Sequence, residues 1–519
     1  MGDDRAVKST RRSLALAGIL TGIAGLVTSQ ATVWIVQARN GPVEAVAALV
    51  RDYTPDDLAH WLIERVGHAD KPLLLSGTAA ILLALCAWAG VEARTRPLLP
   101  DLLYFVLAAL GLGAVLRLDD STVGSSFAVM VGLVTWIVVH RVLTAPLVAD
   151  GEPSLSDEAR RTFLRRVGGT AAAVAAAGVV GGFSSRSRRR VEQARDLLRL
   201  PVHRGAVPAG AGVGVSGVAS WRTSNDRFYL IDTAFSKPTI TPSEWRLRIH
   251  GMVERELNLT YNDLVDRMLP PDRGGRGKLL EDWITLCCVS NEVGGDLIGN
   301  AFWSGVKISD VLAEAGVKPG ANAVLQTSDD GWTCGTPLEA LTGDRNAMLA
   351  LAMNGKPLPI EHGFPVRMVV PGLYGFVSAT KWLVDLEVTT FDEVDAYWTQ
   401  RGWAEKGPVL AQSRIDVPRE GAKTATGRVS IGGSAWAQHL GIREVEYQLD
   451  GGAWQRARLG AAPDTDTWVQ WAGDIDVDEG RHTLVVRATD KSGYTQTSVR
   501  TDVIPSGATG WHTIEFESR

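Results

Sequence analysis

Residues 353–367 read MNGKPLPIEHGFPVR, a short apolar start followed by closely spaced glycines and prolines. Gly and Pro mark turns, so the stretch predicts repeated changes of chain direction rather than a long helix or strand. The turns bring His362 and Arg367 to one neighbourhood, and PGLYG (371–375) and Lys381 follow closely. Donors beside closely approaching backbone suit a phosphate-bearing ligand. Taken alone, His362 and Arg367 could equally be a structural pair that satisfy each other's hydrogen bonds. The succession of turns around them favours a ligand-binding role.

The second feature is the run WITLCCVSN at residues 283–291, which is strand-like and ends in a turn. Such a run directs one sulfur of the pair Cys287 and Cys288 out of a rigid element into a cleft. A thiolate held in this way suits a soft or high-valent transition metal. The alternative is that both cysteines are buried and pack as small hydrophobic residues. For a cysteine pair seen alone, this is the commoner case.

These motifs, in this order, resemble the catalytic domain of the sulfite oxidase family of molybdopterin enzymes. The resemblance rests on TLCC (285–288) with Asn291, on residues 353–367, and on PGLYG followed by Lys381 and Trp382. Further segments are similar to the immunoglobulin-like dimerisation domain of that family, namely residues 397–398, 413–415, 433–436, 450–454, 468–471 and 507–510. The likeness spans about residues 221 to 519.

The resemblance implies a molybdenum–molybdopterin cofactor, which supplies redox chemistry while the protein supplies position and electrostatics. It implies that Cys288 is the catalytic residue and binds the metal through its thiolate, and that Cys287 is not a ligand. The implied pterin-binding residues are Tyr229, Asp232, Thr233, Asp329, His362, Arg367 and Lys381.

Three departures from the family pattern bear on the substrate. Asn291 is followed by Glu292 where sulfite oxidases carry arginines, Leu351 replaces an active-site tyrosine, and an arginine expected near Ile231 is missing. A dianion such as sulfite needs paired positive charge, and a buried carboxylate at Glu292 would repel it. We therefore expect a neutral, small or protein-bound S-oxide or N-oxide as oxo donor or acceptor. The periplasmic methionine-sulfoxide reductases of the family use such a substrate.

The N-terminal third predicts a membrane region. Four stretches are long and apolar enough to cross a hydrocarbon core of roughly 30 Å, namely Ser13–Val36, Pro72–Val91, Leu98–Leu116 and Val123–Val139. Lys and Arg at the N-terminus and in the second connection place the N-terminus in the cytoplasm. The loop 39–71 is mixed in charge, and the connection after Leu116 sets Arg117 beside Asp119 and Asp120.

Residues 159–166, ARRTFLRR, resemble an internal twin-arginine export signal ahead of a weakly hydrophobic stretch, Val167–Phe183. A basic cytoplasmic loop before an ordinary span is the alternative. The export signal predicts a fifth transmembrane helix and a catalytic domain on the extracytoplasmic side of the cytoplasmic membrane. The basic stretch 184–190 would then lie outside, against the positive-inside tendency.

The expected architecture is therefore multi-domain: transmembrane helices, an α+β sulfite-oxidase-type domain and an all-β immunoglobulin-like sandwich. The α+β part is predicted from strand-like runs at 245–249, 323–326 and 366–370 and helix-like runs at 261–268 and 308–315. The sandwich is predicted from alternating runs at 429–431, 443–449, 483–489 and 495–503. The expected boundaries are 1–148 for four transmembrane helices, 149–184 for the signal and fifth helix, 185–220 for a linker, 221–393 for the catalytic domain and 394–519 for the dimerisation domain.

Composition narrows the partners. A net charge of -5 without a basic face argues against nucleic acid, and four unevenly placed cysteines argue against structural zinc. Membrane lipid is an expected partner, and a quinone, a redox partner protein and a homodimer remain open. Paired histidines for haem are missing, because His140 is the one histidine in or near the spans. The rival functions are a thiol–disulfide oxidoreductase using Cys287 and Cys288 and a cofactor-free, membrane-tethered binding protein.

Overall fold

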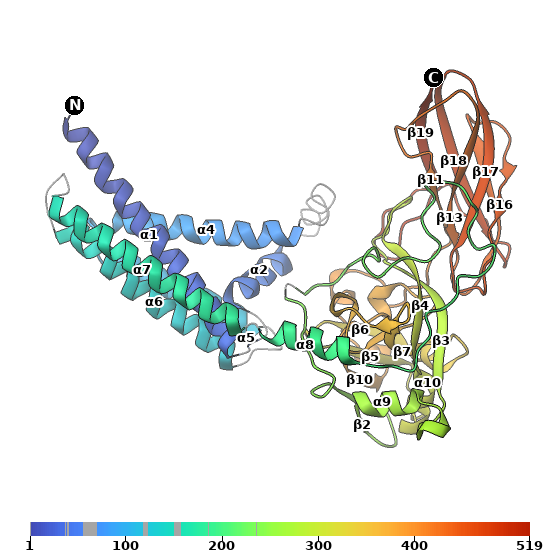
Figure 1. The fold of residues 1–519 in the computed structure, drawn as a ribbon, viewed down its shortest axis with the longest axis horizontal. Helices are drawn as coiled ribbons and strands as arrows, with labels where there is room; N and C mark the ends of the chain where they lie inside the picture. Colours follow the sequence, from blue (N-terminus) through green and yellow to red (C-terminus); the bar gives the residue numbers. More distant parts are fainter. Residues whose placement is uncertain are drawn as a thin grey trace. The chain divides into compact units, whose positions relative to one another are not determined.

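The structure, a computed structural model, describes residues 2–36, 38, 41–54, 70–117, 123–149, 157–184, 186–234 and 236–519 (Figure 1). They form two compact units, 1–190 with 234–236 and 191–233 with 237–519. We call these the helical unit and the catalytic unit. Asp119, Asp120 and most of the loop 39–71, which entered the topology prediction, lie outside the described residues.

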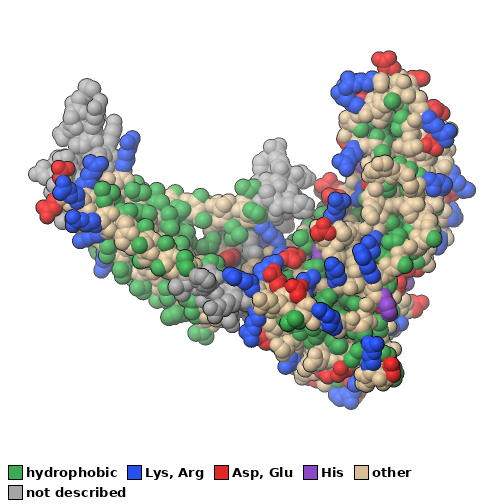
Figure 2. Space-filling model, in the orientation of Figure 1, with side chains coloured by type: hydrophobic (Ala, Val, Ile, Leu, Met, Phe, Trp, Pro, Cys, Tyr) green, Lys and Arg blue, Asp and Glu red, His purple; other side chains and the backbone are tan. Residues whose placement is uncertain are grey.

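Among its described residues, the helical unit contains four helices long and apolar enough to cross a membrane, in agreement with the four predicted spans. These segments are Arg11–Ile35, Lys71–Glu92, Leu99–Arg117 and Val123–Val148. Large apolar side chains on them are exposed, and Figure 2 shows a broad hydrophobic surface over this unit. Side chains of this kind need lipid or another protein around them. The described helices are α1 (Gly2–Ile35), α2 (Pro42–Tyr53), α4 (Asp70–Glu92), α5 (Leu99–Arg117), α6 (Val123–Ala149) and α7 (Asp157–Ser184).

Helix α7 carries the twin-arginine-like sequence. It packs against α1 and α6, and Phe163 is buried in a small core with Leu14 and Leu143. Arg160 and Arg161 are exposed on its first turns. Among the described helices, α7 is not one of the four that are apolar and long enough to span.

The first part of the catalytic unit is α+β. One sheet has the order β2-β1-β10-β5-β6, and a second has the order β3-β4-β7-β8 with β9 beside β7. The predicted helices at 261–268 and 308–315 form with those bounds. Thr260 caps the first of them in a reciprocal capping box with Asp263. The elements are α8 (Arg186–Leu197), β1 (Arg246–Gly251), β2 (Leu257–Thr260), α9 (Tyr261–Met268), β3 (Leu279–Cys287), β4 (Ile298–Lys307), α10 (Ile308–Ala315), β5 (Ala323–Ser328), β6 (Thr333–Pro337), α11 (Leu338–Thr342), β7 (Met348–Met353), β8 (Lys356–Pro357), β9 (Arg367–Val369) and β10 (Leu383–Thr389).

The second part of the catalytic unit is all-β, as predicted. Two sheets, β11-β13-β17-β16 and β12-β19-β18-β14-β15, share one apolar core that includes Ile431, Val445 and Trp471. The strands are β11 (Gln412–Val417), β12 (Lys423–Thr424), β13 (Gly427–Trp436), β14 (Ile442–Leu449), β15 (Gln455–Arg456), β16 (Arg458–Leu459), β17 (Val469–Val477), β18 (Gly480–Asp490) and β19 (His512–Ser518).

The predicted strand at 495–503 is wrong. This segment forms only isolated bridges, Thr489 with Thr495 and Thr501 with Thr509. The place beside β18 is taken by β19, so both edges of β18 are already paired. Alternation of side chains therefore did not identify the strand that actually completes the sheet.

Residues 185–220 were expected to be a linker. Within them, residues 191–220 have little regular structure after α8 but are packed along the catalytic unit. Arg195 Nε donates to the Leu358 carbonyl at 2.8 Å, and the backbone N–H of Val213 donates to Gln470 Oε1 at 3.1 Å. Ala211 is fully buried in a core shared with Trp283 and Trp468. The segment therefore contacts both the α+β part and the sandwich.

Candidate functional site

Cys288 is the first residue of the loop that joins β3 to β4. The two strands pair from Leu279 with Val306 to Cys287 with Ile298, and the Cys288 N–H donates to the Leu297 carbonyl at 2.9 Å. Because side chains alternate along a strand, the two cysteines point to different places. Cys287 packs in the core with Trp283 and Tyr374, whereas Cys288 lines a cavity. The expectation that one sulfur points out of a rigid strand is confirmed.

The cavity at Cys288 has strongly aromatic walls. It encloses about 780 Å³, including space open to solvent. The lining residues are Tyr229, Ile231, Asp232, Thr233, Cys288, Val289, Ser290, Ser328, Asp330, Trp332, Gly375, Phe376, Ala379, Lys381, Trp382, Trp398 and Trp403. We call this the aromatic cavity. Burial raises the pKa of the Cys288 thiol, so without a metal the thiol form is favoured.

Lys381 is the one Lys, Arg or His among the described residues that line the aromatic cavity. Its Nζ lies 3.0 Å from Asp232 Oδ2, and Lys237 pairs with the other oxygen of the same carboxylate. Burial lowers the pKa of Lys381 to about 8, although Asp232 opposes the shift. Lys381 is therefore paired, although it shares Asp232 with Lys237, and Asp330 adds a second carboxylate to the cavity lining.

His362 ends a short 3-10 turn, η3 (Ile360–His362), and is buried. Its Nε2 lies 2.7 Å from the Asn225 carbonyl, which can only accept, so Nε2 carries the hydrogen. Burial lowers the pKa of His362 to about 4, so the ring is neutral near pH 7. Its Nδ1 is then a buried acceptor, and it has no hydrogen-bond partner.

Arg367 begins β9 and is 4% exposed. Its guanidinium donates to the carbonyls of His362, Met368 and Ala379 at 3.2 to 3.4 Å and lies 5.1 Å from the centre of the Trp303 ring. No carboxylate among the described residues forms an ion pair with it. Burial lowers the pKa of Arg367 to about 10. A buried cation with only carbonyl partners is costly, and an anion would compensate it. We call Asn225, His362 and Arg367 the buried cluster.

Most of the residues singled out from the sequence lie at these two places. Tyr229, Asp232 and Thr233 line the aromatic cavity beside Cys288 and Lys381. Asp329 does not line it; its backbone N–H donates to the Trp382 carbonyl at 2.9 Å, and the neighbouring Asp330 lines the cavity instead.

Glu292 is exposed and does not line the cavity, so the argument that a buried carboxylate at this position repels sulfite does not hold. Leu351 is fully buried in β7, also away from the cavity lining. Ile231, by contrast, lines the cavity. Of the three departures from the family pattern, only Ile231 therefore bears directly on the cavity.

The sequence interpretation missed the aromatic walls. Trp332 follows β5, while Trp398 and Trp403 flank the 3-10 turn η6 (Thr399–Arg401), beyond the expected domain boundary at 393. The rings of Trp398 and Trp403 lie 6.0 Å apart, and Phe376 lies 5.7 Å from Trp403. The available signal was the high number of tryptophans, 17 in the chain.

Comparison with known proteins identifies the class of this site. Residues 234–398 match the family described as "Oxidoreductase molybdopterin binding domain". That range includes Cys288, the buried cluster residues His362 and Arg367, and Lys381. The α+β part of the catalytic unit is thus a molybdopterin-binding oxidoreductase domain.

Relatives define the family more closely. The chain is 30% identical over 307 residues to sulfite oxidase of Gallus gallus, covering 49% of this chain and 64% of that protein. It is 32% identical over 173 residues to the oxidoreductase YuiH of Bacillus subtilis, covering 33% of this chain and 79% of that protein. The chain belongs to the sulfite oxidase family of molybdopterin-dependent oxidoreductases. It spans about half the length of most of the curated sulfite oxidases it matches.

One solved structure, the sulfane dehydrogenase SoxCD of Paracoccus pantotrophus, is 27% identical and covers 53% of this chain and 76% of that chain, with a TM-score of 0.45.

The residues present fit the cofactor of this family. Molybdopterin carries an anionic phosphate and a pterin ring with N–H donors. Arg367 is a buried cation without a carboxylate partner, and His362 Nδ1 is a buried acceptor without a donor. Among the described residues there is no group of three or more His, Cys, Asp or Glu that would hold a metal ion unaided. A metal at Cys288 therefore needs ligands from a cofactor.

Proposed function

We propose that this protein is a membrane-anchored molybdenum-cofactor oxidoreductase that transfers an oxygen atom to or from a neutral S-oxide or N-oxide rather than sulfite. One observation carries the choice of substrate. Lys381, the one cation among the described lining residues, is paired with Asp232, while four tryptophans line the same cavity. Sulfite needs uncompensated positive charge, whereas a neutral oxide with apolar substituents gains from burial against aromatic rings.

The cofactor would be held by both parts of the site. Cys288 would bind the metal, Arg367 the phosphate, and His362 Nδ1 a pterin N–H. Tyr229, Asp232, Thr233 and Lys381 are proposed as further pterin contacts. Asp329 does not line the cavity and is proposed to act through its neighbour Asp330. When bound, the molybdenum centre supplies two-electron oxygen-atom transfer.

The protein's own residues orient the substrate and control its surroundings. Trp332, Trp398 and Trp403 line the same cavity as Cys288. A substrate held against them is partly desolvated, which favours a neutral molecule over an ion.

The surroundings of the enzyme follow from the sequence arguments. We propose that the four apolar helices anchor it in the cytoplasmic membrane, that the first turns of α7 act as a twin-arginine-like signal, and that the catalytic unit lies on the extracytoplasmic side. The C-terminal sandwich is proposed as an immunoglobulin-like domain that supports a homodimer. A redox partner protein or a quinone would supply or accept electrons.

The test compares two adjacent cysteines. Cys288→Ala and Cys287→Ala are purified beside the wild type from cells that make the cofactor, and molybdenum, pterin and oxide reduction are measured. We expect pterin in all three, at least a 1000-fold loss of activity in Cys288→Ala, and less than a tenfold loss in Cys287→Ala, because only Cys288 reaches the cavity. Wild-type protein without pterin, or equal losses in both variants, would contradict the proposal.

A further inference from the structure

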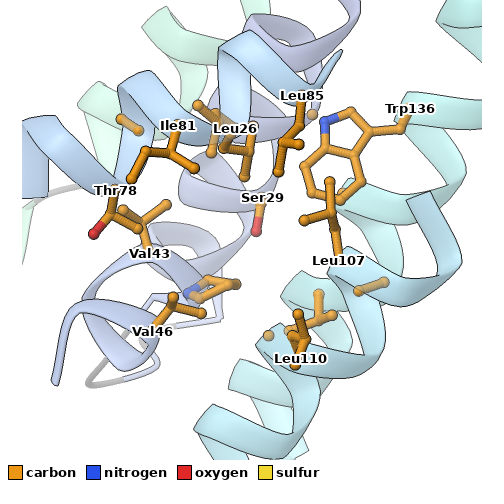
Figure 3. Close-up of a pocket in the computed structure, with 18 residues that line it drawn as sticks. Leu26, Ser29, Val43, Val46, Thr78, Ile81, Leu85, Leu107, Leu110 and Trp136 are labelled. Atoms are coloured by element: carbon orange, nitrogen blue, oxygen red, sulfur yellow. The ribbon is translucent and has the colours of Figure 1, made fainter. Parts of the chain in front are cut away.

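The helical unit contains an apolar cavity between five helices (Figure 3), and it encloses about 790 Å³, including space open to the outside. Its walls come from α1, α2, α4, α5 and α6, and apart from Ser29, Thr78 and the Trp136 indole every lining side chain is apolar or glycine. The Ser29 and Thr78 hydroxyls donate to backbone carbonyls of Ala128 and Leu74. Ile81 and Leu110 line the cavity and are more than half exposed, so it opens on the side of the helices. Walls of this kind suit a lipid-soluble ligand.

A buried polar pair lies one helical turn from this cavity. The Tyr104 hydroxyl and Nδ1 of His140 are 3.0 Å apart, and both side chains are nearly inaccessible. Tyr104 precedes the lining residue Ala108 by four positions, and His140 follows the lining residue Trp136 by four. The Tyr104 and Trp136 rings are 5.8 Å apart. Polar, proton-carrying groups inside a membrane region are expensive and mark function.

We propose that this cavity binds the head of an isoprenoid quinone, with its tail leaving between α4 and α5. A lipid acyl chain would need only the apolar walls, whereas a quinone also uses the nearby Tyr104–His140 pair for protons.

The electron role of this site rests on the proposed function, but quinone binding does not. A quinol releases two electrons and two protons as it becomes a quinone. Reduction of an S-oxide or N-oxide consumes two electrons and two protons, and the oxygen leaves as water. The two half-reactions therefore balance without a further reactant.

Two glycines on α5 give a matched test. A Cβ at Gly111 would meet only Pro42 and Val129 at 3.8 and 3.9 Å, so a larger side chain there grows into the cavity. Gly113 is exposed and has nothing within 4 Å of its Cβ position. Gly111→Leu fills the cavity, whereas Gly113→Leu makes the same change on the outer face.

The experiment uses full-length protein in phospholipid nanodiscs, photolabelled with an azido-ubiquinone and competed with ubiquinone-1 or with oleate. We expect label on peptides of α4, α5 or α6, competition by ubiquinone-1 only, and at least tenfold weaker binding in Gly111→Leu than in Gly113→Leu. Label elsewhere, equal binding in both variants, or competition by oleate as strong as by ubiquinone-1 would overturn the site. If Gly111→Leu does not fold, Val129→Phe, which fills the same cavity from α6, replaces it under the same criteria.

A second readout separates this proposal from the proposed function. Oxide reduction is measured with ubiquinol-1 and, separately, with reduced methyl viologen. We expect Gly111→Leu to lose at least tenfold with ubiquinol-1 and to keep its rate with the dye. Quinone binding without oxide reduction by either donor would sustain the site and contradict the proposed function, and loss with both donors alike would contradict the electron role of the site.

Discussion

The buried cluster and the aromatic cavity hold their positive charges in opposite ways. In the buried cluster, Arg367 is 4% exposed and has only carbonyl partners. In the aromatic cavity, Lys381 is paired with Asp232, which also binds Lys237. Uncompensated positive charge therefore lies on the buried side, where an anionic cofactor group would bind. The lining of the aromatic cavity is close to neutral, and the proposed preference for neutral oxides over sulfite rests on this contrast.

The strongest way to break the contrast is to remove the buried charge. We expect Arg367→Leu to weaken cofactor retention by on the order of 100-fold or more, because loss of one partner of a buried charge pair costs about 2–5 kcal/mol. Pterin and molybdenum content after gel filtration measures this. Arg248→Leu, which breaks the exposed pair with Glu256, is the control and should retain both. Full pterin content in Arg367→Leu would remove Arg367 from the phosphate site.

A smaller effect is expected on the stability of the fold when the pH is lowered. Because the folded-state pKa of His362 is about 4 instead of 6.5, the unfolded chain takes up a proton in this interval that the folded chain does not. Stability should therefore fall as the pH drops from 6.5 to 4, by at most about 3 kcal/mol from this residue. His512, with a pKa also lowered to about 4 by burial, adds to the same interval.

Urea unfolding at pH 7 and pH 4.5 measures the effect of acid. His362→Gln should lose less stability on acidification than the wild type. His482→Gln is the opposite control, because Asp450 raises the pKa of His482 and the folded state gains from that charge at low pH. This variant should lose more than the wild type. Equal losses in His362→Gln and the wild type would show that His362 is not held neutral by burial.

The smallest expected effect is on inhibition by sulfite, and it comes from adding a positive charge to the aromatic cavity. Ile231 lines the aromatic cavity and is 40% exposed, so Ile231→Arg would add a cation where the family pattern expects one. We expect twofold to fivefold stronger inhibition by sulfite, because a partly exposed ion pair is worth ~0.2–1 kcal/mol. Leu230→Arg, a similarly exposed neighbour outside the cavity, should leave inhibition unchanged. The same increase in both variants would mean that general surface charge is responsible.

Local patterns predicted the parts of the site that depend on neighbouring residues. The strand ending at Cys287 and the turns that hold His362 and Arg367 are set by side-chain alternation and by Gly and Pro, and both signals are visible over a few residues. The separation of Cys287 from Cys288 follows from the same alternation. The four apolar spans were equally readable, because length and hydrophobicity alone define them.

What the sequence did not predict depends on contacts between distant segments. Trp398 and Trp403 lie beyond the expected catalytic domain, and only the fold brings them to the cavity that Cys288 lines. The exposure of Glu292 and the exclusion of residues 495–503 from the sheet are also decided by packing. Asn225, whose carbonyl fixes the tautomer of His362, carries no local signal at all.

The packed course of residues 191–220 determines where a membrane-free enzyme can begin. Val191 and Ala211 are members of two different cores of the catalytic unit, and Arg458 donates to the Val213 carbonyl at 2.9 Å. A chain cut at Trp221, where strongly patterned sequence starts, would leave holes in both cores and unpaired polar groups on the sandwich. A soluble portion made for secretion or crystallisation should accordingly begin before Val191, so that residues 191–220 remain packed on the catalytic unit.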